Sequence, residues 1–338
     1  MALTVAYGSY EVFEYALLEL VTDEGSPGMG EAAPDVAVTG ETQASDIAAL
    51  QAAREVLIGK NPFDFVNILR ELEALIPQAP AARAAVDMAL YDLMGKALKL
   101  PLYTLLGGKM REAAIAYPVI PLDTPQIMAA TASQYAAGAK TLKLKIGGTI
   151  AEDVARLAAI RAAIGDQIKL RVDVNQGWGD AQTAIAAIQA LQEFDLEYVE
   201  QPVKDSDIEG MAEVCHAVDV PIMADESLHS PADARQIIAR QAADMFNIKL
   251  MKCGGILRAL EILSLAEAAG IPCIVGSMGE SSIASAAAVH LSVARNILAC
   301  EAIGPLFVKN DPATGFLVDM QRMLLLPSQA PGLGVAWK

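Results

Sequence analysis

The sequence predicts an α/β protein in two parts, a small α+β domain at the N-terminus followed by a closed parallel (β/α) barrel. Two observations indicate the barrel. Eight short aliphatic runs occur between residues 113 and 303, with starts 23 to 28 residues apart, and Ala-rich helical patterns fill most of the gaps. Regular alternation of strands and helices is typical of parallel sheets, and eight strands suit a closed ring. An open doubly wound sheet is the alternative, but no glycine-rich phosphate loop follows the first strand.

The barrel strands are expected where short runs of aliphatic residues recur. These runs are 113–120, 141–146, 169–174, 196–200, 221–226, 244–250, 272–277 and 297–303. Three of the gaps show clear helical spacing, at 150–164, 182–193 and 256–269. We therefore assign residues 111–310 to the barrel.

The first 110 residues predict a hairpin followed by helices. Two strands are expected at 10–22 and 28–33, joined by a turn at Asp23-Glu24-Gly25. Apolar residues then recur three and four apart, and Pro80 suits the start of the last helix. The expected helices are 45–58, 63–75 and 81–98. Residues 1–110 are taken as the α+β domain.

Composition limits the classes of partner. The formal net charge of -16 argues against nucleic acid and against an anionic membrane surface. No apolar run approaches the roughly 20 residues that a membrane helix needs. The four cysteines are scattered, which fits reduced thiols; they are Cys215, Cys253, Cys273 and Cys300. We expect a cytoplasmic protein without nucleic-acid or membrane partners.

Two lysines mark the second barrel strand. Lys143 and Lys145 are two residues apart, so on a strand both side chains face the same way, while Leu142, Leu144 and Ile146 face the helices. Neighbouring ammonium groups repel, and we expect this to lower the pKa of at least one of them. A lysine that loses its proton near pH 7 is a general base. A solvated edge strand with both lysines in water is the alternative.

Acids occupy the ends of the next three strands. Asp173, Glu200 and Asp225 each lie at the C-terminal end of a run, where barrel enzymes place reactive groups, and Glu226 follows Asp225. Three carboxylates at one barrel mouth would repel strongly unless a cation neutralised them. Hard oxygen ligands suit Mg²⁺. A helix cap or a solvated loop position is the alternative for each acid taken singly.

The sixth strand ends in another lysine, Lys249. Strands two and six lie opposite each other in a ring of eight, so Lys145 and Lys249 would flank a substrate from opposite faces. That layout suits removal of a proton from one face of a carbon acid and its return on the other. Lys252 and Cys253, in the loop beyond, are expected in solvent.

Five motifs occur in order over nearly the whole chain. They are Lys143-Leu-Lys145, Asp173-Val-Asn175-Gln-Gly-Trp178, Val199-Glu200-Gln201-Pro202, Ala224-Asp225-Glu226-Ser227 and Asn247-Ile-Lys249-Leu-Met-Lys252. Together they resemble the enolase superfamily, and within it the muconate-lactonizing enzyme subgroup. The resemblance implies a modified TIM-type (β/α)7β barrel with an N-terminal α+β capping domain, completed by the C-terminal tail 311–338.

The resemblance also implies roles for the charged residues. Lys145 and Lys249 would be the acid/base pair, and Lys143 would tune Lys145. The implied Mg²⁺ ligands are Asp173, Glu200 and Asp225, and the bound metal would stabilise an enediolate. A histidine base is disfavoured because the sixth strand ends in lysine. The histidines are expected to be structural; they are His216, His229 and His290.

Further segments resemble the dipeptide epimerases of this subgroup. These segments are 30–34, 38–42, 278–282 and 331–334. They imply an isomerase that performs a 1,1-proton transfer at the α-carbon of the C-terminal residue of a small dipeptide. The implied substrate-binding residues are Thr39, Ser277, Met278, Glu280, Glu301 and Ile303.

One departure affects the implied substrate. In L-Ala-D/L-Glu epimerases, two aspartates one residue apart on the eighth strand bind the dipeptide ammonium, whereas this chain reads Glu301-Ala302-Ile303. Isoleucine cannot pair with a cation, so the ammonium site is weakened or the pocket suits another ligand.

Other functions and features stay open. A muconate-type cycloisomerase, an o-succinylbenzoate synthase or an N-acylamino acid racemase of the same subgroup is an alternative, as is a barrel that binds a carboxylate without turning it over. We expect residues 1–10 to reach the active site as part of a capping loop, and the chain to form a homo-oligomer.

Overall fold

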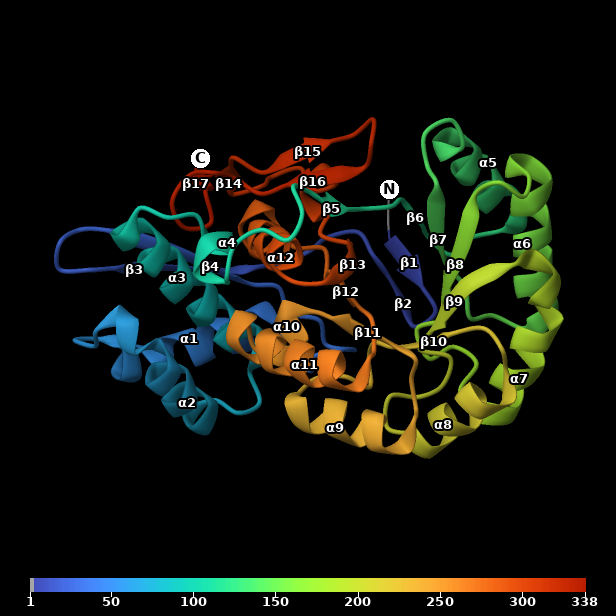
Figure 1. Cartoon of the computed structure of the whole chain (residues 1–338), viewed down its shortest axis with the longest axis horizontal. Helices are drawn as coiled ribbons and strands as arrows, with labels where there is room; N and C mark the ends of the chain where they lie inside the picture. Colours follow the sequence, from blue (N-terminus) through green and yellow to red (C-terminus); the bar gives the residue numbers. More distant parts are fainter. Residues whose placement is uncertain (1–2) are drawn as a thin grey trace.

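The larger part of the molecule is a barrel, in which eight parallel strands form one curled sheet (Figure 1). The structure, a computed structural model, describes residues 3–338. Strands neighbour one another in chain order, from β6 at one end of the order to β13 at the other. The strands are β6 (Val119–Ile120), β7 (Thr141–Lys145), β8 (Lys169–Asp173), β9 (Leu196–Glu200), β10 (Ile222–Ala224), β11 (Met245–Ile248), β12 (Cys273–Val275) and β13 (Ile297–Cys300).

Helices fill all seven connections between these strands, which confirms the expected (β/α)7β barrel. Figure 1 shows α5 to α9 along the outside of the sheet. The helices are α5 (Pro125–Tyr135), α6 (Ile150–Ile164), α7 (Ala181–Ala190), η2 (Gln192–Phe194), α8 (Ile208–Ala217), α9 (Pro231–Arg240), α10 (Leu250–Cys253), α11 (Ile256–Ala269) and α12 (Ser282–Ala294). Side chains in the sequence cap several of them, as where Thr149 and Glu152 form a capping box at α6.

Successive side chains of β7 point alternately to the hydrophobic core and to the barrel interior. Leu142 and Leu144 are fully buried and join the main hydrophobic cluster together with Leu157 of α6. Lys143 and Lys145 point to the other face, as the period of two requires. Both lysines are buried, with exposed fractions of 1% and 9%, so the solvated edge strand is excluded.

The interior below the candidate site is filled by a second buried cluster. It consists of Tyr117, Tyr198, Met223, Ile274 and Ala299. The Tyr117 hydroxyl donates to Glu301 Oε1 at 2.6 Å, which links the segment before β6 to the residue after β13. This bond connects the segments that adjoin the two end strands of the sheet order.

The N-terminal part contains the expected hairpin and helices. β3 (Ala16–Val21) pairs antiparallel with β4 (Pro27–Ala32) around the predicted turn, where Gly25 has φ +81°. The strand expected at 10–22 is shorter than predicted: β3 begins only at Ala16, and Tyr10 belongs to another strand, which pairs near the N-terminus. The helices are α1 (Gln43–Leu57), η1 (Pro62–Asp64), α2 (Phe65–Leu75), α3 (Pro80–Leu98) and α4 (Leu102–Leu105).

Close packing joins the hairpin to α3. A Cβ at Gly30 would lie 1.9 Å from the Ala85 carbonyl oxygen, and one at Gly28 would lie 2.3 Å from that of Ala89. Only glycine lets β4 approach the helix backbone this closely. Hydrophobic burial around α3 then holds the hairpin in place.

The C-terminal tail folds against the N-terminal helices. After η3 (Gly304–Leu306), its elements are β14 (Ala313–Thr314), β15 (Leu317–Asp319), β16 (Leu324–Leu326) and β17 (Ala336–Trp337). Leu333 N donates to Asp92 Oδ1 of α3 at 2.8 Å, and Leu102 N donates to the Gly332 carbonyl at 2.8 Å. These contacts support the capping domain proposed for 1–110 and 311–338, whose boundaries stay a prediction.

The run expected as the first barrel strand is divided. β5 (Ala114–Ile115) pairs antiparallel with β16 of the tail, and only β6 belongs to the barrel sheet. The prediction of a single strand at 113–120 was therefore wrong. Aliphatic content alone does not show that the chain changes sheets within this run.

A short hairpin near the N-terminus lies beside the barrel strands (Figure 1). β1 (Leu3–Val5) pairs with β2 (Gly8–Tyr10), and Leu122 N, just after β6, donates to the Thr4 carbonyl at 2.8 Å. Leu3 lines a cavity together with Lys145, so the segment reaches the lysines as expected. Met1 and Ala2 lie outside the described residues. No helix within residues 3–338 is long and apolar enough to span a bilayer.

Candidate active site

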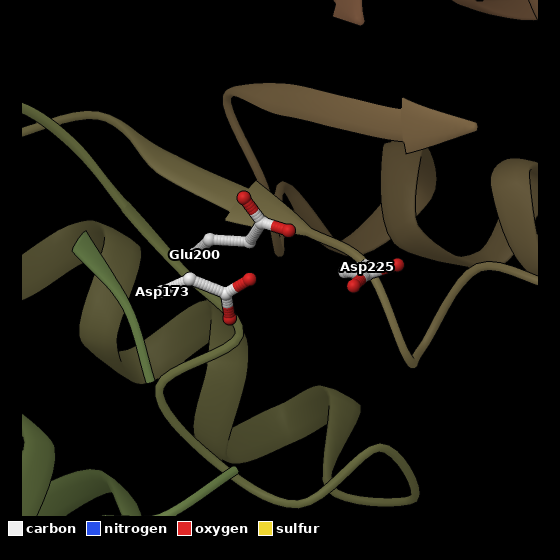
Figure 2. Close-up of side chains that lie close together, drawn as sticks. All are labelled: Asp173, Glu200 and Asp225. Atoms are coloured by element: carbon white, nitrogen blue, oxygen red, sulfur yellow. The ribbon is translucent and has the colours of Figure 1, made fainter. Parts of the chain in front are cut away.

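Three carboxylates from neighbouring strands meet at one end of the barrel (Figure 2). Asp173 ends β8, Glu200 ends β9 and Asp225 directly follows β10. Strand pairing sets Asp173 opposite Glu200, and Glu200 opposite Met223. One oxygen of each carboxylate lies within 4.8 Å of the others, and all three side chains are fully buried. The structure thus brings the three predicted acids together.

Lys143 lies among the acids. Its Nζ is 3.0 Å from Asp173 Oδ2, 2.8 Å from Glu200 Oε2 and 2.8 Å from Glu301 Oε1. Burial favours the neutral amine, but the three carboxylate charges outweigh it and hold the pKa of Lys143 well above its ordinary value. The expectation that neighbouring ammonium groups would lower a lysine pKa was wrong for Lys143, because acids surround it.

The other two predicted lysines contact different members of the acid cluster. Lys145 Nζ donates to Asp173 Oδ2 at 2.6 Å, and Lys249 Nζ donates to Asp225 Oδ2 at 2.7 Å. Lys145 ends β7 and Lys249 follows β11, and these strands are four apart in the sheet order. The amines therefore approach the acids from opposite sides of the barrel.

Lys252 and Cys253 are buried, and the prediction of solvent exposure was wrong. Their exposed fractions are 1% and 4%. Lys252 Nζ donates to Asp225 Oδ1 at 2.6 Å and also contacts the Asp225 carbonyl. The short helix α10 returns this side chain toward the barrel, because residues three apart share a helix face and Lys249 already points inward. Two ammonium groups together hold the pKa of Asp225 below its ordinary range, although burial opposes them.

Several buried oxygens beside the acids have no hydrogen-bond partner within residues 3–338. They are Glu200 Oε2, Glu226 Oε2 and Asn247 Oδ1. Glu200 Oε2 lies near Lys143 but lacks the alignment of a hydrogen bond. Burial, and then the charge of Asp173, raise the pKa of Glu200 well above its ordinary value. Buried carboxylates with spare oxygen lone pairs are the donor set that a hard divalent cation requires, so these residues fit Mg²⁺.

Amide side chains fix the orientation of two acids. Asn247 Nδ2 donates to Glu200 Oε1 at 2.8 Å, and Asn175 Nδ2 donates to Glu226 Oε1 at 3.0 Å. Asn175 also accepts from Lys145 Nζ at 3.1 Å. Each carboxylate is thereby left with one oxygen free of amide contact.

A cavity of about 180 Å³ adjoins the lysines of β7. Three of the six predicted substrate-binding residues line it: Ser277, Glu301 and Ile303. Its full lining is Leu3, Phe13, Val119, Pro121, Thr131, Tyr135, Lys143, Lys145, Ser277, Gly279, Glu301, Ile303, Gly304, Phe307 and Val308.

The other three predicted substrate-binding residues lie outside this lining. Glu280 is buried, which raises its pKa, and it accepts a hydrogen bond from the Ser277 hydroxyl. Thr39 is half-buried, and its hydroxyl donates to the Asp35 carbonyl at 3.1 Å. Met278 is half-buried against the main hydrophobic cluster.

None of the three histidines is among the clustered acids or the lysines that contact them. His216 is exposed on α8 and His229 is half-buried before α9. His290 of α12 accepts from Tyr103 N at Nδ1, at 3.2 Å, and its Nε2 therefore carries the proton for the Leu333 carbonyl, 3.1 Å away. Burial lowers its pKa to about 4. These contacts give His290 a structural role.

Comparison with protein families agrees with this architecture. Residues 127–338 match the family described as enolase C-terminal domain-like, and residues 2–107 match the N-terminal domain of mandelate racemase / muconate lactonizing enzyme. The chain belongs to the enolase superfamily.

Several relatives of this enolase-superfamily chain have assigned activities. A hydrophobic dipeptide epimerase of Enterococcus faecalis is 41% identical, covering 98% of this chain and 94% of the relative. Its crystal structure with Mg and the dipeptide L-Leu-L-Tyr superposes with a TM-score of 0.95, over 99% of this chain and 95% of that one. An N-succinyl-L-Arg/Lys racemase of Bacillus cereus is 40% identical, covering 98% and 90%.

A solved structure with lower identity has the same fold. The dipeptide epimerase of Cytophaga hutchinsonii, complexed with Mg and D-Ala-L-Val, is 34% identical. It superposes with a TM-score of 0.97 over 100% of this chain and 92% of that one.

Sequence reasoning missed several interior residues of this superfamily member. Arg171 and Tyr198 lie two residues before Asp173 and Glu200, and the Arg171 guanidinium stacks 4.4 Å from the ring centre of Tyr117. The Tyr117 and Tyr198 hydroxyls are 3.0 Å apart. Side chains two residues apart on a strand share a face. This rule, applied from Asp173 and Glu200, would have placed Arg171 and Tyr198 on the interior face.

Proposed function

We propose that this chain is a Mg²⁺-dependent dipeptide epimerase, an isomerase that moves a proton at the α-carbon of the C-terminal residue of a small dipeptide. One observation carries the proposal: Lys145 and Lys249 come from opposite strands and each contacts a carboxylate of the same buried acid cluster. The relatives that act on dipeptides support the substrate class.

The metal ligands are assigned to Asp173, Glu200 and Asp225, whose oxygens lie within 4.8 Å of one another. Bound Mg²⁺ would supply positive charge for the substrate carboxylate and for the negative charge left when the α-proton departs. The asparagine at 247 holds one oxygen of Glu200 and leaves the other available.

The two lysines are assigned the proton transfer. A neutral amine on one face takes the α-proton, and the ammonium group on the other face returns one, which inverts the carbon. In the structure both Nζ atoms donate to acids of the metal set, Lys145 to Asp173 and Lys249 to Asp225. For the transfer, each Nζ must lie beside the substrate's α-carbon, and the lysine that takes the proton must be neutral. Lys143, fully surrounded by acids, stays charged and is a positioning residue.

The reaction is tested by exchange of solvent deuterium. A library of L,L-dipeptides in heavy water with Mg²⁺ should gain one deuteron at the α-carbon of the C-terminal residue and yield the L,D isomer, as measured by mass spectrometry and chiral chromatography. Absence of both across the library contradicts the proposal. A rise in melting temperature with Mg²⁺ and a carboxylic acid but without exchange would indicate a binding barrel instead.

Substitution of each lysine tests the two-face assignment. Lys145→Ala and Lys249→Ala should each lower epimerisation by at least about a hundredfold, the lower end of general acid–base contributions. Each variant should retain exchange with one stereoisomer only, because the remaining lysine faces one side of the carbon. Equal loss of exchange with both isomers in both variants would contradict the assignment. Loss confined to one lysine would indicate a cycloisomerase or a synthase that uses a single base.

Three further features remain proposals. The contacts of α3 with the tail support a capping domain made of residues 1–110 and 311–338.

The thiols within the described residues are all free, which supports a cytoplasmic location. A homo-oligomeric state is proposed for the chain, and light scattering of the purified protein would measure it.

A further inference from the structure

Two of the three acids drawn in Figure 2 each have one oxygen held by a donor of the protein. Asp173 Oδ1 accepts from the backbone N–H of Asn175 at 3.1 Å, and Glu200 Oε1 accepts from Asn247 Nδ2 at 2.8 Å. Both donor residues are buried, so these hydrogen bonds lie in surroundings of low dielectric constant, which strengthens them. Each of these acids therefore has one oxygen engaged by the protein and one that is not.

Lys252 holds the third acid in the same way. Its Nζ donates to Asp225 Oδ1 at 2.6 Å and to the Asn247 carbonyl at 3.3 Å, and it also contacts the Asp225 carbonyl. An ammonium group has three N–H donors, so these three acceptors use all of them. The side chain is buried, and Asp225 Oδ1 is thereby held in a fixed contact.

The second oxygen of each acid faces a different lysine. Asp173 Oδ2 lies 2.6 Å from Lys145 Nζ, Glu200 Oε2 lies 2.8 Å from Lys143 Nζ, and Asp225 Oδ2 lies 2.7 Å from Lys249 Nζ. Lys249 and Lys252 therefore contact different oxygens of the same carboxylate. Their substitutions can separate the effect of charge from the effect of the held oxygen.

The number of oxygens that the acids can offer decides which cation fits. Ca²⁺ binds about six to eight oxygens and often takes both oxygens of one carboxylate, whereas Mg²⁺ requires near-octahedral geometry and keeps several waters. An acid with one oxygen held by a fixed donor can give a metal only the other oxygen. Three such acids suit Mg²⁺ and leave Ca²⁺ short of ligands unless a held oxygen is released.

We propose that Lys252 and Asn247 are positioning residues that set the metal selectivity of this site. Because each engages one oxygen of its acid, each acid is limited to a single bond with the metal, and Mg²⁺ is favoured over Ca²⁺. The inference rests on the proposed metal site, and it concerns which cation is preferred rather than the reaction.

Calorimetric titrations of the purified chain with Mg²⁺ alone and with Ca²⁺ alone test this selectivity without a substrate. The quantity compared is the ratio of the two dissociation constants. The unsubstituted chain should bind Mg²⁺ more tightly. Lys252→Met and Asn247→Leu should each shift the ratio toward Ca²⁺ by about tenfold, the lower end of the effect of groups that orient metal ligands. Each variant frees one carboxylate oxygen, and only Lys252→Met also removes a charge.

Lys249→Met is the matched control. It removes an ammonium group from the same carboxylate but leaves Asp225 Oδ1 held by Lys252. Loss of a neighbouring positive charge should raise the affinity for both cations and leave their ratio unchanged. An equal shift of the ratio in Lys249→Met and Lys252→Met would mean that charge decides the selectivity, and this overturns the inference.

Two further outcomes contradict different claims. A preference of the unsubstituted chain for Ca²⁺, or an unchanged ratio in both Lys252→Met and Asn247→Leu, overturns the inference and leaves the proposed reaction intact. Absence of Mg²⁺ binding to the unsubstituted chain contradicts the proposed metal site itself. Melting curves establish that each variant is folded, and if Lys252→Met does not fold, the ratio measured for Asn247→Leu decides.

Discussion

The buried acids of the candidate site differ in how many ammonium groups they contact. Asp225 is held by Lys249 and Lys252, and its pKa lies below the ordinary range. Glu200 has Lys143 as its ammonium neighbour within the described residues, and burial raises its pKa. Ionised Asp225 therefore stabilises the fold, whereas ionised Glu200 costs stability until a cation binds. Of these two proposed metal ligands, Asp225 therefore also contributes to folding through its lysine partners, whereas Glu200 does not.

This difference predicts that substitutions of the two acids change stability by unequal amounts and weaken metal binding alike. Without metal at pH 7, Asp225→Asn should lower the free energy of unfolding by about 3–5 kcal/mol, because it leaves two buried ammonium groups unpaired. Glu200→Gln should change it by less than about 1 kcal/mol, since a raised pKa means that the neutral form suits the folded site. Both should weaken Mg²⁺ binding at least about tenfold.

Urea unfolding in a chelator and calorimetric titration with Mg²⁺ alone measure the two quantities. Asp205→Asn, an exposed acid outside the cluster, is the control and should alter neither. Equal destabilisation by the two cluster variants would disprove the division of roles.

At the scale of single residues, the sequence predicts the acids and three of the lysines that contact them but misses Lys252. Asp173, Glu200 and Asp225 could be found because each ends a strand, and strand ends meet in a barrel. Lys252 could not, because it lies beyond a strand, where solvent is the usual surrounding. Its burial depends on the helical turn of α10, which a four-residue segment does not reveal.

At the scale of elements, α12 connects the barrel to both ends of the capping region. Glu31 of β4 accepts from Ser281 N at 2.8 Å and from Ala284 N at 3.2 Å, at the start of the helix. Near its end, His290 contacts the backbone of Tyr103 and Leu333. The helix α12 and the residue before it therefore form hydrogen bonds with β4, with α4 and with the tail.

The buried His290 predicts a pH dependence of stability. Its pKa falls from 6.5 to about 4 because burial disfavours the imidazolium. A lowered pKa in the folded state gives stability that is present above pH 6.5 and is lost as pH falls toward 4, since the unfolded chain binds the proton first. The loss attributable to this residue is about 3 kcal/mol.

Substitution separates this contribution from the other titrating groups. His290→Gln should be less stable at pH 7 but lose less stability between pH 6.5 and 4 than the unsubstituted chain, as measured by urea unfolding. His216→Gln, on the exposed face of α8, should follow the unsubstituted chain. Parallel pH profiles for all three proteins would contradict the assignment.

Over the whole molecule, the spacing of aliphatic runs predicts the barrel because each strand and its helix form a local unit. It misses contacts between residues far apart in sequence. The run at 113–120 divides because β16, some two hundred residues later, pairs with its first part. The hydrogen bond from Leu333 to Asp92 spans 241 positions. No local pattern encodes such contacts, so the tail could be placed only by resemblance.

The close contact between Gly332 of the tail and Asp92 of α3 predicts how much stability is lost when a side chain is added at Gly332. Gly332 has φ +69°, and a Cβ there would lie 2.0 Å from Asp92 Oδ1 and 2.8 Å from the Asp92 carbonyl oxygen. Its backbone also bonds with Leu100 and Leu102. Gly270 has φ +74° but has no atom within 4 Å of the added Cβ, so it isolates the backbone strain. Gly270→Ala should cost about 1 kcal/mol, whereas Gly332→Ala should cost about 3 kcal/mol or more because the helix must also move. Urea unfolding compares the two, and equal costs would mean that the tail yields without disturbing α3.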